Sequence, residues 1–170
     1  VKGVSRTRGD SYRSYTRVVL TVLLVVLAGA PNADVACLPV PPAVTRLGAE
    51  AVDAYRDNLQ PDEKAPRVST APTGARLFLR VIWSSAEKPT VLATLMEDAF
   101  TWSFGGDASS KQALQEWQKD PTTPKKLRAA IAGTCSREGD VVTCAARKGP
   151  RLTLEKQAGC WRWTAFVEGD

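Results

Sequence analysis

The feature that most constrains this chain is a short run in which large aromatic residues alternate with small ones. Within residues 98–107, every second position carries a large ring at Phe100, Trp102 and Phe104. A period of two places these rings on one face of a β-strand. The following Gly105-Gly106 predicts a turn at its end. We therefore expect the domain core to be built against this aromatic face.

An apolar run lies near the start of the sequence. Residues 18–30 read VVLTVLLVVLAGA and follow a segment that contains five basic residues. As a helix this run rises about 20 Å, which is short of the ~30 Å hydrocarbon core of a bilayer. A basic region, a short apolar core and a small-residue end are typical of an export signal. The sequence predicts a leader over residues 1–36 and an exported protein, in the periplasm or at the outer surface.

Three fates of this leader remain open. Ala28-Gly29-Ala30 matches a cleavage site for export signals. If the leader stays uncleaved, residues 18–30 would contact the membrane. Val35-Ala36-Cys37 matches the end of a lipoprotein box, so that a lipid on Cys37 would be the anchor instead.

Residues 37–74 are predicted to be a proline-rich tether with one helix. Residues 43–59 carry apolar side chains at spacings of three and four, which indicates an amphipathic helix that packs on the domain or binds a partner. Residues 60–74 contain three prolines and almost no large apolar residue, which favours a linker. A compact domain is therefore predicted over residues 75–170.

The spacing of apolar residues changes along the predicted domain. Helical spacing is expected over residues 75–83, from Pro89, after Ser109 and after Thr123. Three short strands at residues 141–146, 151–156 and 160–167 then form an antiparallel meander. The predicted fold class is α+β, with N-terminal helices packed on an antiparallel sheet that ends in this meander.

Individual residues of the same region predict two helix ends and the buried face of one strand. Ser109 and Gln112 have the spacing of a capping box, and Gly133 suits a helix C-terminus. In the last strand, alternation predicts one buried face made of Trp161, Trp163, Ala165 and Val167.

Four cysteines in an exported chain predict disulfides. The best pair is Cys135–Cys144, which would join the two sides of a short loop. The other pair, Cys37–Cys160, would tie the tether to the last strand. A zinc site is disfavoured, because the chain has no C-x-x-C pair and no histidine.

Charge and composition argue against several functions. Histidine is absent, which removes the commonest general base and metal ligand. Beyond residue 36, the chain has 18 basic and 16 acidic residues, so that a nucleic-acid partner is not expected. We expect no catalytic residue, cofactor or metal.

The order of helices, aromatic strand and a meander that ends in residues 159–167 resembles the NTF2-like cone fold. The segment 103–107, with Trp117 ten residues further on, also resembles uncharacterised exported bacterial proteins. The NTF2-like resemblance implies an interior that holds a small ligand or catalytic carboxylates. The candidate ligand-binding residues are Trp102, Phe104, Asp107, Trp117 and Trp163.

Two functions are consistent with these patterns. The first is an exported, non-catalytic binding or structural module of the cell envelope, whose partner is an envelope protein or polymer. The alternative is an NTF2-like domain that binds or hydrolyses a small molecule, with Asp98 or Asp107 as the carboxylate in its pocket.

Overall fold

The computed structural model describes residues 37–102 and 106–168, with the backbone alone for residues 106–108. The predicted leader, including residues 18–30, lies outside the described residues. The helices are α3 (Pro42–Thr45), α4 (Ala49–Asn58), α5 (Thr73–Ser84), α6 (Pro89–Leu95), α7 (Ser110–Lys119) and α8 (Thr123–Ala132). The strands are β1 (Met96–Trp102), β2 (Gly106–Ser109), β3 (Thr134–Glu138), β4 (Val141–Ala145), β5 (Arg151–Gln157) and β6 (Cys160–Val167). The predicted α+β class and the β4–β5–β6 meander are confirmed.

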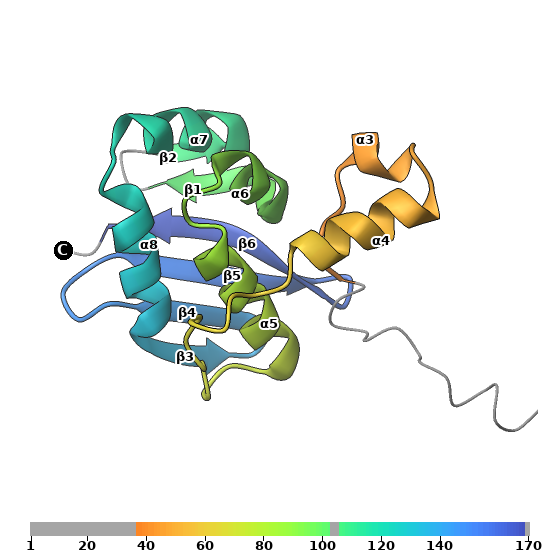
Figure 1. Cartoon of the computed structure of the whole chain (residues 1–170). Coiled ribbons are helices and arrows are strands. Elements are labelled where there is room, and N and C mark those ends of the chain that lie inside the picture. The colour runs from red at the N-terminus through yellow and green to blue at the C-terminus, as the bar shows by residue number, and fades with distance from the viewer. Residues whose placement is uncertain (1–36, 103–105, 169–170) are drawn as a thin grey trace, which may run out of the picture. The chain divides into compact units, whose positions relative to one another are not determined.

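The strands form one mixed sheet in the order β2-β1-β6-β5-β4-β3 (Figure 1). Strand β1 runs parallel to β6, whereas every other neighbouring pair is antiparallel. The prediction of a purely antiparallel sheet is therefore wrong. A parallel pair needs a long crossover, and here α7, α8 and the meander supply it. Local sequence periodicity carries no information about that long-range pairing.

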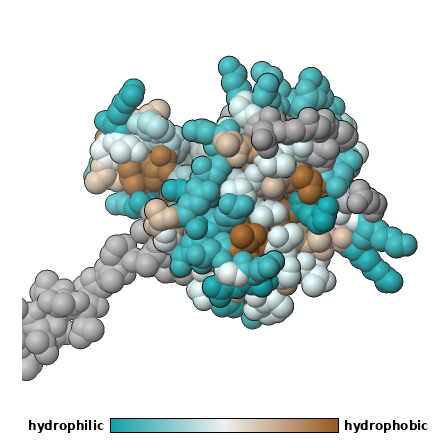
Figure 2. Space-filling model, turned by 180° about the vertical axis from the view of Figure 1, so that it is seen from behind, coloured by the Kyte–Doolittle hydropathy of each residue, from teal (hydrophilic) through white to brown (hydrophobic). Residues whose placement is uncertain are grey.

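Helices cover one face of the sheet. Leu152 and Leu154 of β5 are buried beneath them, as are Val142 and Cys144 of β4. Partly exposed residues that alternate with these, such as Thr153, lie on the opposite face. Figure 2, seen from behind Figure 1, shows hydrophilic and weakly polar side chains with only separate hydrophobic spots. The core therefore lies between the sheet and a single helical layer.

The segment predicted as a linker contributes to that core. Val68 and Ala71 are buried and belong to the hydrophobic core cluster, as does Leu59 at the end of the predicted helix that precedes them. Residues 37–74 thus lie in the same compact unit as residues 75–168, and the core extends beyond the boundary predicted at Ala75. A proline-rich composition does not prevent this packing, because a few apolar residues between prolines can each fill a small space in the core.

Helices α3 and α4 form a hairpin that is anchored at few points. No residue of α4 is buried, and Leu47 in the turn between the helices is 76% exposed. The Tyr55 hydroxyl shares a 2.7 Å hydrogen bond with Thr94 Oγ1 of α6. The predicted helix over residues 43–59 is thus two helices, and its apolar side packs on the domain only in part.

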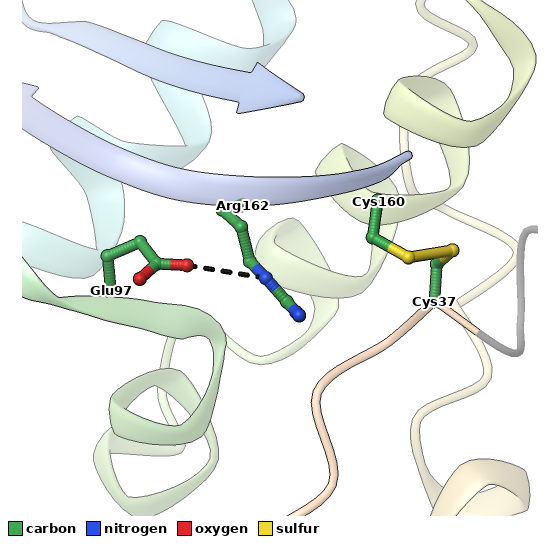
Figure 3. The surroundings of a disulfide bond; sticks show 4 residues. All are labelled: Cys37, Glu97, Cys160 and Arg162. Carbon is green, nitrogen blue, oxygen red and sulfur yellow. Dashed lines mark ion pairs between the residues drawn. A yellow bond between two sulfur atoms is a disulfide. The ribbon is translucent and has the colours of Figure 1, made fainter. Parts of the chain in front are cut away.

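Both predicted disulfide pairs are present. Cys135 of β3 faces Cys144 of β4 in register, with 4.0 Å between their Cα atoms. Cys37 is joined to Cys160 at the start of β6, with a Cα–Cα distance of 5.2 Å (Figure 3). A lipid on Cys37 would occupy the same Sγ atom, so that the Cys37–Cys160 disulfide and lipidation exclude each other.

A β-bulge changes which residues of β6 reach the core. Thr153 pairs with Ala165 and Leu154 pairs with Trp163, which leaves Thr164 as an extra residue. Phe166 is consequently buried, whereas Ala165 and Val167 are only partly so. The predicted buried face was right at Trp161 and Trp163 and wrong after the bulge, because simple alternation fails there.

Gly133 ends α8 as predicted, and the reason is a close approach of two backbones. Its φ is −78°, so the backbone needs no left-handed conformation. A Cβ atom at this position would lie 2.0 Å from the Ala145 carbonyl oxygen of β4. Glycine is therefore required by the distance between α8 and the sheet.

Gly133→Ala is expected to lower the free energy of unfolding by about 1–3 kcal/mol, because the backbones of α8 and β4 must separate. Urea denaturation measures this loss. The matched control is Gly139→Ala, where a Cβ meets open space and only a φ of +57° opposes it. A smaller loss for Gly133→Ala than for this control would contradict the close-approach argument.

Candidate functional site

Aromatic side chains from three elements converge where β1, β6 and α7 meet. The Trp102 ring lies 5.5 Å from Trp117 and 5.6 Å from Phe166, measured between centroids. Trp163 makes edge contacts with Phe100 at 5.1 Å and with Trp117 at 6.0 Å. Edge-to-face and tilted contacts at these distances stabilise a core beyond simple burial.

The rings of this aromatic cluster pack closely against one another. The cluster consists of Phe100, Trp102, Trp117, Trp163 and Phe166. Trp163 and Phe100 are 0% exposed. The Trp163 indole Nε1 donates a 3.0 Å hydrogen bond to the Ala165 carbonyl oxygen at the bulge. The interior of the cluster therefore fills the core.

A cavity of about 280 Å³ opens at the edge of the cluster. Trp102 and Phe166 supply its aromatic wall, and α7, α8 and the end of β6 supply polar side chains. The lining residues are Trp102, Glu116, Lys119, Asp120, Thr123, Lys126, Phe166 and Glu168. Its size approaches the lower end of the range for small-molecule sites, which is about 300 Å³.

The charged groups of this cavity are joined in ion pairs. Lys126 Nζ donates to Asp120 Oδ2 at 3.1 Å and also to Glu168. Lys119 Nζ lies 2.7 Å from Glu116 Oε1 across one turn of α7. An aromatic wall beside paired charges suits a small ligand with both an apolar and a polar part.

Hydrogen bonds hold Asp120 in its ionised form. The Thr122 hydroxyl donates to Asp120 Oδ1 at 2.7 Å, and the Thr122 backbone N–H donates to it at 2.8 Å. These bonds, together with Lys126, lower the pKa of Asp120 from 3.8 to about 2. Hydrogen bonds to Glu168 first, and then to Asp120, raise the pKa of Lys126. A carboxylate with so low a pKa is a poor proton donor or acceptor near neutral pH.

Thr122→Ala is expected to raise the pKa of Asp120 toward 3.8, because the hydroxyl donor is lost. The bonds to ionised Asp120 stabilise the fold above its unfolded pKa, and this contribution disappears as the pH falls through about 2. An NMR titration of the Asp120 carboxyl carbon measures the pKa directly. Thr153→Ala on the uncovered sheet face is the control and should leave it unchanged, and equal shifts in both variants would contradict this assignment.

The predicted ligand-binding residues have different positions in the structure. Trp102 lines the cavity, whereas Trp117 and Trp163 do not line it and pack with Trp102 in the aromatic cluster. Phe104 lies outside the described residues, and Asp107 is described only as backbone in β2. Of the predicted ligand-binding residues whose side chains the structure describes, Trp102 alone lines this cavity.

The carboxylates of the cavity were missed. Asp98, the other candidate carboxylate, is exposed on β1 and does not line the cavity. Its neighbour Glu97 pairs with Arg162 Nε of β6 at 3.3 Å (Figure 3). Asp120, Lys126 and Glu168 come from three elements, so no spacing in the sequence signals that they meet.

Within the residues that the structure describes, no group of three potential ligands is placed to bind a metal ion. In the same part of the chain, no helix has the length and apolar character needed to cross a membrane. No family model, curated protein or solved structure matches this chain.

Proposed function

We propose that this chain is an exported, non-catalytic binding module of the cell envelope. Two disulfides support an oxidising compartment, because such bonds persist outside the reducing cytosol. The basic and apolar pattern of residues 1–30 supports export by the same chain. The partner we propose is an envelope protein or polymer.

The observation that carries the binding role is the cavity beside Trp102. Its aromatic wall would contact an apolar group of the partner, and its lysines and carboxylates would bind polar groups around it. The same cavity favours a second candidate, a domain that binds a small molecule as the NTF2-like resemblance implies. Hydrolysis is not proposed, because Asp120 is held ionised by Thr122 and Lys126.

A blocked cavity tests the proposal. Lys119 lies on the rim with an exposed side chain, so that Lys119→Trp would obstruct the cavity without changing the core. The full chain and this variant are incubated with purified wall polymer and with envelope membrane extract, and retention is measured. We expect at least one of the two materials to retain the wild type, and Lys119→Trp to reduce that retention about tenfold.

The matched control is Lys111→Trp, at an exposed position of the same helix that does not line the cavity. It should be retained like the wild type. Failure of both materials to retain the wild type, or equal losses in the two variants, would contradict the proposed site.

A further inference from the structure

A second cavity has no acidic side chain among the described residues that line it. It measures about 160 Å³ and is lined by Cys37, Pro72, Gly74, Phe78, Arg137, Lys156, Gly159 and Trp161. Among the described residues that line it, Arg137 and Lys156 are the only charged ones, and both are exposed cations. The lining is therefore positive, in contrast to the mixed charges beside Trp102.

The two cations share a face at one end of the sheet. Lys156 of β5 pairs in register with Trp161 of β6, and Arg137 lies two residues beyond the buried Cys135 of β3. The Arg137 Nε donates a 2.8 Å hydrogen bond to the Gly139 carbonyl oxygen, which orients its guanidinium group. Neither cation takes part in an ion pair with another described residue.

The N-terminus of α5 adds positive potential to the same cavity. Pro72 and Gly74 line it, and α5 has no side-chain cap. The Thr73 hydroxyl accepts a 3.0 Å hydrogen bond from Arg76 Nη2, so this hydroxyl is engaged with another cation. The first backbone N–H groups of a helix have no partner within it, and its dipole is positive there.

The positive charges of these groups repel one another unless an anion lies between them. Two cations beside the positive end of a helix repel each other and the partial positive charge of that helix end. A tetrahedral oxyanion accepts hydrogen bonds from several directions, which matches donors that come from a helix and two strands. We propose that this second cavity binds a phosphate group.

The phosphate group has two possible sources, a free phosphate monoester or the phosphodiester of a lipid headgroup or wall polymer. The inference does not depend on the cavity beside Trp102, because no described residue lines both cavities. It can therefore fail or succeed independently of the proposed function.

The test is an NMR titration of the full, oxidised chain at constant ionic strength. The probes are inorganic phosphate, glycerophosphoglycerol as a phosphodiester, and acetate. We expect saturable shifts of the Gly74 and Ala75 amide signals with one of the two phosphate probes. The phosphate probe that binds more tightly identifies the source of the phosphate group.

Arg137→Gln combined with Lys156→Gln should weaken this binding at least about tenfold, because two charge-assisted hydrogen bonds are lost. The matched control is Arg147→Gln combined with Lys148→Gln, which removes the same charge from the exposed β4–β5 turn. Shifts that do not saturate, equal weakening in both double variants, or equal affinity for acetate would overturn the proposal. Thermal unfolding of each variant verifies that it is folded.

Discussion

Trp163→Ala is expected to lower the free energy of unfolding by about 3–5 kcal/mol, which is a large part of the stability of an ordinary domain. The side chain is 0% exposed and contacts Phe100, Trp117 and Phe166. Its loss leaves a void that these rings cannot close, and it also removes the hydrogen bond to the Ala165 carbonyl oxygen. Urea denaturation followed by far-UV circular dichroism measures the change.

Trp83→Ala is the matched control on α5. Trp83 is only partly buried, and its ring lies 4.9 Å from the Arg128 guanidinium carbon. Loss of this cation–π contact and partial burial is expected to cost about 1–2 kcal/mol. Equal losses for the two variants would contradict the view that the aromatic cluster is the centre of the core.

The Cys37–Cys160 disulfide is expected to stabilise the fold more than the Cys135–Cys144 disulfide does. Its cysteines are 123 residues apart in sequence, against 9 for the other pair. In the chain-entropy model, removal of the long-range bond costs about 5 kcal/mol and removal of the short-range bond about 2.5 kcal/mol. The difference arises because the longer loop restricts the unfolded chain more.

The comparison uses Cys37→Ser with Cys160→Ser in one variant, and Cys135→Ser with Cys144→Ser in the other. Each keeps the remaining disulfide, so that each acts as the control of the other. Denaturation midpoints under non-reducing conditions rank the two bonds. A larger loss for the Cys135–Cys144 variant would show that loop length does not determine the ranking.

Sequence periodicity predicted the elements best where one local pattern controls them. The capping box at the start of α7 is present, with Gln112 N donating to Ser109 Oγ at 3.3 Å. Phe100 and Trp102 share the buried face of β1, and the meander strands begin at the predicted residues or very close to them. These features depend on neighbours within a few residues.

The missed features depend on contacts between distant segments. Strand β3 was taken as one side of a loop, because TCSRE lacks a buried face beyond Cys135. The parallel pairing of β1 with β6 and the burial of Phe166 after the bulge also come from tertiary packing. Glu168, just after β6, pairs with Lys126 of α8, which is likewise a contact between distant segments.

Our central claim is that, in the oxidised protein, a disulfide joins the segment before α3 to the final strand. The most direct test isolates the native protein with its thiols alkylated at lysis, and maps its disulfide-linked peptides by mass spectrometry. The claim predicts no free thiol and two linked pairs, Cys37–Cys160 and Cys135–Cys144. Four alkylated cysteines, or Cys37 linked to any other residue or to a lipid, would contradict it.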